Sequence, residues 1–232
     1  MHYRVISIGA LSRHPLWTRP LPERSAHATT TLIQTDDRRI LVDPALPAEA
    51  LQARLVERAG TTFDQITDVF LTNFRPAHRR ALPALRRADW WISEAEREMV
   101  GVHLVEQLHK LRDDQEPGDP QSDDAAKLIE HDIATLKRCK PAPDRLAAQV
   151  DLFPLPGFTP GTCGLLLGFN QATVLIAGDA VATYEHLLQG QVLAGAYDID
   201  QAKESFAEAV EIADWLIAGH DNVLPNPTRR AL

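Results

Sequence analysis

The pattern of hydrophobic and polar positions predicts the same order of elements twice along this chain: two short strands, a helix and a further strand. In the first half, β-branched and aliphatic residues at 29–33 and 39–42 flank a turn of two aspartates, which predicts a hairpin. Apolar residues at helical spacing then predict a helix over 48–59 that ends at Gly60. A short apolar run at 68–72 predicts a buried strand.

The second half repeats this order of elements without repeating the sequence. Apolar runs predict strands at 150–155, 165–167 and 173–176, and the last two flank a second hairpin turn. A helix over about 200–213 then leads to a short strand at 215–217. Each half is therefore expected to contribute one hairpin, one helix and one further strand.

Between these halves the pattern changes to two charged helices. They are predicted at 94–113 and 123–138, and the polar linker 115–120 separates them. We expect one domain over 1–232 that carries this pair as a helical insertion at about 94–140. The apolar stripe of the pair would cover a pocket or form the surface of a homodimer.

Composition excludes several classes of partner. The chain has 232 residues, 44% of them hydrophobic, which is enough for a substantial core. A formal net charge of −8 argues against a nucleic-acid or anionic-membrane binder, so the expected partner is a small molecule or anion. No segment is apolar enough to span a bilayer and no signal peptide is evident, so we expect a cytoplasmic protein. Cys139 and Cys163 form no C-x-x-C pair and are expected to be free thiols.

The strand predicted at 68–72 leads into a loop with a motif-like sequence, Thr-Asn-Phe-Arg-Pro-Ala-His. This loop resembles the T-H-x-H-x-D-H motif of the metallo-β-lactamase superfamily. Thr72 and His78 match that motif. Asn73, Arg75 and Ala77 stand where the family usually has two histidines and an aspartate.

Other landmarks of the same family follow in the family's order. They are a Leu-Val-Asp-Pro strand end, P-G-x-T-P-G, A-G-D-A and a late Gly-His pair, and together they run through nearly the whole chain. The resemblance implies an α/β fold, a four-layer αββα metallo-β-lactamase-like sandwich with a metal site at one sheet edge. It further implies that His78, Asp179 and His220 converge at that edge.

The first metal position of the family does not carry over to this chain. Three histidines would build it, and the matching residues are Asn73, Arg75 and Phe158. An amide, a guanidinium that stays protonated and a hydrocarbon ring cannot hold zinc. These three residues are instead candidates for contact with a substrate or an anion.

The second metal position carries over except for one ligand. The family's two aspartates and two histidines map to Ala77, His78, Asp179 and His220, so three of four ligands remain. Two imidazoles and a carboxylate with open positions suit one Zn²⁺, Fe²⁺ or Mn²⁺. Such a metal would lower the pKa of bound water to about 7 and polarise a carbonyl or phosphoryl oxygen. Asp179 is therefore also the candidate catalytic residue.

Two functions stay open at this stage. The first is a mononuclear metal-dependent hydrolase of a small ester, lactone, thioester or phosphodiester. The second is an inactive, metal-free member of the superfamily that binds a small anion or serves as an interaction module. In that second case Arg75 would pair with Asp179 and replace the missing metal charge by an ion pair.

His27 is a further candidate because it begins the first hairpin. The sequence His-Ala-Thr resembles the start of this segment in the lactonase-like branch of the superfamily, where it borders the site. His27 would then donate to Asp179, replace a metal ligand or contact the substrate. The alternative is a histidine that merely begins a strand.

Overall fold

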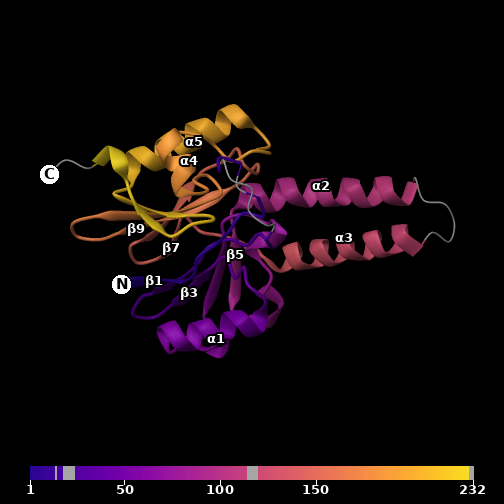
Figure 1. Ribbon diagram of the computed structural model, residues 1–232. Coiled ribbons are helices and arrows are strands. Elements are labelled where there is room, and N and C mark those ends of the chain that lie inside the picture. The colour runs from indigo at the N-terminus through magenta and orange to yellow at the C-terminus, as the bar shows by residue number, and fades with distance from the viewer. Residues whose placement is uncertain (14, 18–23, 114–119, 230–232) are drawn as a thin grey trace.

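Two mixed β-sheets of six strands each lie face to face at the centre of the molecule (Figure 1). The computed structural model describes residues 1–13, 15–17, 24–113 and 120–229. In spatial order, the first sheet consists of β1 (His2–Ser7), β2 (Thr30–Gln34), β3 (Arg39–Val42), β4 (Asp68–Leu71), β5 (Asp89–Ile92) and β6 (Lys140–Pro141). Strands β1 to β3 pair antiparallel, whereas β3 to β6 pair parallel.

The second sheet has one parallel pair, which matters for the site. In spatial order its strands are β12 (Val223–Pro225), β11 (Trp215–Ala218), β10 (Thr173–Gly178), β9 (Cys163–Gly168), β8 (Val150–Pro154) and β7 (Arg145–Ala147). Only β10 and β11 run parallel among these described strands. The carboxyl ends of β10 and β11 therefore lie at the same edge.

Helices cover both outer faces, so the predicted four-layer αββα sandwich is confirmed (Figure 1). Helix α1 (Ala48–Ala59) packs on the first sheet, and α4 (Tyr184–Gln189) and α5 (Ile199–Ile212) lie on the second. Short 3₁₀ turns complete the described elements: η1 (Phe63–Gln65), η2 (Pro76–His78), η3 (Leu82–Ala84) and η4 (Pro227–Arg229).

The core follows from the alternation of side chains along each strand. Ile40 and Val42 of β3 enter the core between the sheets, whereas Leu41 faces outward against Leu51 and Leu55 of α1. Successive side chains of a strand point to opposite faces, so a strand that is apolar throughout is buried on both sides. These strands hold the site loops at one end of the sandwich.

The predicted helical pair forms a hairpin that projects from the sandwich (Figure 1). Helix α2 (Glu94–Asp113) has the predicted bounds, whereas α3 (Pro120–Arg138) begins three residues before the predicted 123. Proline suits the first turn of a helix because that turn lacks an internal acceptor for its N–H. The predicted linker 115–120 lies outside the described residues except for Pro120.

Two further expectations concern the chain as a whole. Cys139 and Cys163 are both buried and free. Among the described helices, none combines the length and the apolar character that crossing a bilayer requires.

Candidate metal centre

The site forms where three loops leave the ends of β4, β10 and β11. His78 lies on the turn η2 after β4, Asp179 follows β10 directly, and His220 follows β11. All three side chains are buried, and one ligand atom from each lies within 4.8 Å of the other two. The structure therefore brings together the three residues that the sequence assigns to a metal.

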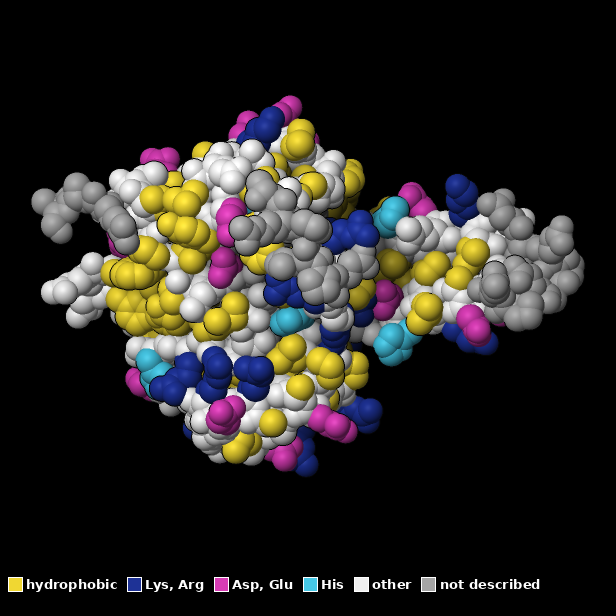
Figure 2. Space-filling view, in the orientation of Figure 1, with side chains coloured by type: hydrophobic (Ala, Val, Ile, Leu, Met, Phe, Trp, Pro, Cys, Tyr) yellow, Lys and Arg dark blue, Asp and Glu magenta, His cyan; other side chains and the backbone are white. Residues whose placement is uncertain are grey.

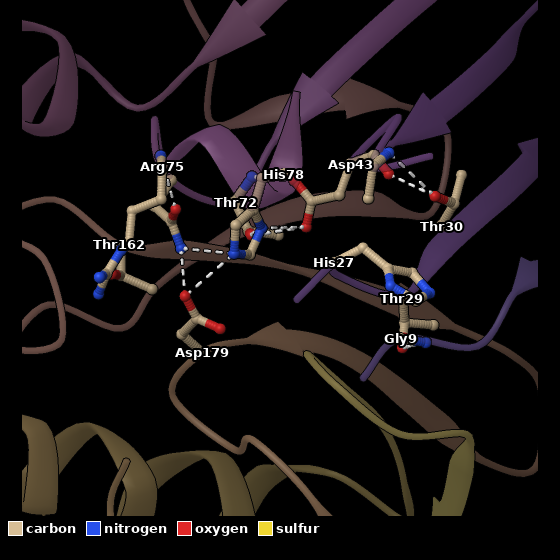
Figure 3. A network of polar contacts seen from close by, with 12 residues as sticks. Gly9, His27, Thr29, Thr30, Asp43, Thr72, Arg75, His78, Thr162 and Asp179 are labelled. Atoms are coloured by element: carbon tan, nitrogen blue, oxygen red, sulfur yellow. Dashed lines mark hydrogen bonds and ion pairs between the residues drawn. The ribbon is translucent and has the colours of Figure 1, made fainter. Parts of the chain in front are cut away.

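His78 lies between two aspartates (Figure 3). Its Nδ1 is 3.0 Å from Asp43 Oδ2 and its Nε2 is 3.0 Å from Asp179 Oδ2. The Asp43 carboxylate is fixed in turn by the backbone N–H of Thr72 at 2.9 Å and the Thr72 hydroxyl at 2.7 Å. Because an aspartate orients Nδ1, the Nε2 atom is directed at Asp179.

His220 is oriented by the backbone. Its Nδ1 donates to the carbonyl oxygen of His27 at 3.0 Å, and its own N–H donates to the carbonyl of Ala182 at 2.8 Å. With the proton on Nδ1, the lone pair of Nε2 faces Asp179 Oδ1 at 2.9 Å. Both imidazoles thus direct Nε2 at the same carboxylate.

The Asp179 carboxylate has one satisfied oxygen and one that lacks a donor. Oδ2 accepts the side-chain amide of Asn73 at 2.9 Å. Oδ1 is buried, and within the described part of the chain no group is aligned to donate it a hydrogen bond. A buried carboxylate oxygen without a donor is uncommon, whereas a cation between this oxygen and the two Nε2 atoms would satisfy all three. The residues present therefore fit a single divalent metal.

The electrostatics of the site couple His78 to Asp179. Burial alone would lower the pKa of His78, but Asp179 and Asp43 outweigh it and raise that pKa to about 10. Burial alone would raise the pKa of Asp179, but the positive charge of His78 outweighs it and holds that pKa well below its usual range. In the metal-free protein His78 is therefore an imidazolium between two carboxylates, and a metal must displace its proton.

The residues at the other metal position form a separate arrangement. Asn73 Oδ1 accepts the backbone N–H of Arg75 at 3.0 Å, which fixes the amide so that its nitrogen faces Asp179. The guanidinium carbon of Arg75 lies 4.8 Å from the centroid of the Phe158 ring. The ion pair between Arg75 and Asp179 predicted for the metal-free alternative is absent from the described residues. That prediction is wrong because Asn73 already donates to the carboxylate, while the longer Arg75 side chain stacks on Phe158.

The ring of His27 turns away from Asp179. Its nitrogens lie 3.1 Å from the carbonyl of Ser25 and 3.2 Å from that of Ile8. The prediction that this imidazole donates to Asp179 or replaces a ligand is therefore not met. His27 instead acts through its backbone carbonyl, which holds the ring of His220.

The three ligands lie at the base of a cavity of about 460 Å³. The volume is that of a small-molecule site. Arg75 and Phe158 lie on its wall, and the other lining residues are mostly apolar: Leu11, Ser12, Arg13, Pro15, Ala26, Ala77, Leu193 and Ala194.

Sequence reasoning missed Glu96, a fully buried carboxylate on the first turn of α2. It accepts from the backbone N–H of Phe74 at 2.9 Å, the hydroxyl of Thr159 at 2.7 Å and the backbone N–H of Gly161 at 3.0 Å. Burial raises its pKa. Glu96 thus fastens the helical hairpin both to the loop after β4, which contains the motif, and to the loop that contains Phe158, Thr159 and Gly161. A glutamate in a charged helix carries no sequence signal for this role.

The sequence model of the metallo-beta-lactamase superfamily matches residues 26–220, a span that contains every ligand described above. The chain belongs to that superfamily. No curated protein matches the sequence.

Solved structures of this superfamily share the fold at low sequence identity. A candidate metallo-beta-lactamase from Thermotoga maritima is 20% identical over 96% of this chain and 98% of its own, with a TM-score of 0.65. AidC, a dizinc quorum-quenching lactonase, is 16% identical over 86% of this chain and 73% of its own, with a TM-score of 0.63. AiiA from B. thuringiensis is 16% identical over 90% of this chain and 86% of its own, with a TM-score of 0.60. At these identities the likeness shows the fold alone.

Proposed function

We propose that this chain is a hydrolase that uses one divalent metal, held by His78, Asp179 and His220. The expected ion is Zn²⁺, with Fe²⁺ or Mn²⁺ as the other ions that this donor set suits. The substrate would be a small ester, lactone, thioester or phosphodiester. Hydrolases and lactonases among the structural neighbours support the reaction class.

The observation that carries this proposal is the convergence of three potential metal-ligand atoms at one buried place. The Nε2 atoms of His78 and His220 both face Asp179, and Asp179 Oδ1 has no donor among the described residues. Lone pairs that converge in a buried place repel one another unless a proton or a cation lies between them. A divalent cation held there would supply Lewis-acid activation of water and of the substrate oxygen.

The chain's own residues orient the ligands and exclude solvent. Asp43 and the His27 carbonyl hold the two rings by their Nδ1 atoms, so neither Nε2 turns away. Asn73, which stands in the place of a first-position histidine of the family motif, donates to Asp179 Oδ2. The ligands themselves are buried, so electrostatic interactions among them are stronger than they would be in water.

Metal content and hydrolysis, measured together, test the proposal. Protein purified without chelator should contain about one metal ion per chain and hydrolyse at least one of a 4-nitrophenyl ester, a γ-lactone, a thioester and bis(4-nitrophenyl) phosphate. Chelation should abolish this activity, and added Zn²⁺ or Mn²⁺ should restore it. Asp179→Asn and His220→Ala should lose both metal and activity, whereas His103→Ala, an exposed histidine on α2, should lose neither. Equal activity in the stripped protein and in Asp179→Asn would rule the proposal out.

A metal-free anion-binding protein is the second candidate, and the protonated state of His78 favours it. An imidazolium between Asp43 and Asp179 forms an ion pair with each carboxylate without any metal. In that case no metal would copurify and added Zn²⁺ would not raise the unfolding temperature.

A further inference from the structure

The cavity is basic in a chain that is acidic overall. Its described lining includes Arg75 and a single carboxylate, Asp179, which is already paired with histidines. The chain as a whole carries a formal net charge of −8. Basic side chains also gather beside the base of the helical hairpin on the face seen in Figure 2. A basic cavity in an acidic protein concentrates anions at that place.

Arg75 differs from two other stacked arginines, Arg79 and Arg138, in what its side-chain N–H groups do. Arg79 stacks on Phe74 and donates to the Phe74 carbonyl and to Asp132. Arg138 stacks on Trp90 and donates to the carbonyl of Arg86.

Arg75 stacks on Phe158, but among the described residues no oxygen accepts a hydrogen bond from its guanidinium. Stacking occupies the face of a guanidinium and leaves the N–H groups along its edge available.

The backbone of Arg75 is held by the site itself. Its N–H donates to Asn73 Oδ1 at 3.0 Å, and its carbonyl accepts the N–H of His78 at 2.9 Å. The Phe158 ring under the guanidinium is only 5% exposed. An arginine whose backbone is hydrogen-bonded and whose guanidinium is stacked on a ring loses little conformational entropy when it binds an anion.

We propose that Arg75, stacked on Phe158, binds an anionic group of the ligand, so that the substrate of this site is a small anionic ester with a carboxylate or phosphate group. This inference rests on the proposed hydrolase function for the scissile bond, but Arg75 binds the anion whether or not a metal is present. The apolar wall around Leu11, Leu193 and Phe158 contacts the chain that joins the two ends of the substrate.

Binding to the chelator-stripped protein tests Arg75 separately from the metal. The probes are hexanoate and hexyl phosphate, with hexanamide as the uncharged counterpart, measured by isothermal titration calorimetry. Both anions should bind more tightly than hexanamide, and Arg75→Gln should weaken them roughly 10- to 100-fold, the usual value of hydrogen bonds to a charged group. Arg54→Gln, an exposed arginine on α1, should change nothing. Hexanamide binding as tightly as the anions, or equal effects of the two variants, would overturn the inference.

Hydrolysis by the zinc-loaded protein provides the second test. Mono-4-nitrophenyl glutarate and 4-nitrophenyl pentanoate have acyl chains of equal length, and only the glutarate carries a carboxylate. The ratio of their kcat/KM values should favour the glutarate ester roughly tenfold or more, and Arg75→Gln should bring the ratio close to one. Failure of the two proposals is distinguishable. Hydrolysis of both esters without preference would rule out only the anion site. Arg75-dependent anion binding without hydrolysis would rule out only the hydrolase function.

Discussion

Two groups of residues meet at Asp179 and differ in their chemistry: one can hold a metal and the other cannot. On one side, His78, Asp179 and His220 are buried and directed at one another, and Asp43 and a backbone carbonyl hold the histidines from behind. On the other side, the side-chain amide of Asn73 donates a hydrogen bond to Asp179, and Arg75 stacks on Phe158.

Under the proposed function, this difference accounts for the loss of one metal position and the retention of the other. Asn73 donates to Asp179 Oδ2, so the carboxylate keeps a partner on the side where the first metal would lie. Oδ1, on the other side, has no such substitute among the described residues. The group of His78, Asp179 and His220 therefore keeps a carboxylate oxygen that a cation could satisfy, whereas Asn73 already satisfies the other oxygen.

The largest effect is expected from the residue at which both groups meet. Asp179→Asn should abolish metal binding and lower the free energy of unfolding of the metal-free protein by about 3 to 5 kcal/mol, because it removes one of the two carboxylates that pair with the buried charge of His78. Urea unfolding with chelator present, together with metal analysis, measures both changes. The exposed Asp200→Asn should change stability by less than about 1 kcal/mol. A stable, metal-binding Asp179→Asn would refute the shared role.

The metal-free protein should lose stability in alkali. The pKa of His78 is raised from 6.5 to about 10 in the folded state, so its stabilising effect is fully present below about pH 6.5 and is lost as the pH rises toward 10. Thermal unfolding in chelator across that pH range measures how the unfolding temperature changes with pH. His78→Gln should weaken this dependence on pH. A flat curve for the unaltered protein would mean that His78 is neutral in the fold.

Asp43 should affect the strength of metal binding but not its stoichiometry. It touches His78 Nδ1 and would not touch the metal, so Asp43→Asn should lower affinity about 10- to 100-fold and leave one site per chain. Competition with a chromophoric chelator measures this. Unchanged affinity would show that Asp43 does not orient His78 for a metal.

The smallest effect at the site is expected from Glu96. Glu96→Gln leaves the Gly161 N–H without its carboxylate acceptor and should cost about 1 to 3 kcal/mol of stability. Metal affinity should change little, because Glu96 contacts the loops and not the ligands. Glu98→Gln, an exposed glutamate on the same helix, is the matched control for urea unfolding. Equal stability of the two variants would show that Glu96 does not fasten the hairpin.

Much of the fold could be predicted from sequence because its strands are strongly apolar and the landmarks lie in the family's order. The predicted bounds of α1 and α2 agree with the structure. Strand β1 (His2–Ser7) was not predicted, because it is an edge strand whose outward residues are polar, and the short α4 (Tyr184–Gln189) was not predicted either.

Of the contacts in the site, only the convergence of the candidate metal ligands could be predicted from the sequence. His78, Asp179 and His220 follow from the family motifs, and they meet as expected. Which group satisfies Asp179 could not be read from sequence, because Asn73 and Arg75 lie two positions apart and either side chain could reach the carboxylate. The role of Glu96 depends on long-range packing of α2, which no local pattern encodes.

Metal stoichiometry tests the central claim most directly. Elemental analysis after equilibrium dialysis against Zn²⁺ should give one ion per chain for the unaltered protein, none for His220→Ala, and two for the triple variant Asn73→His, Arg75→His, Phe158→His, which restores donors at the first position. Two ions in the unaltered protein, or one that persists in His220→Ala, would contradict the account.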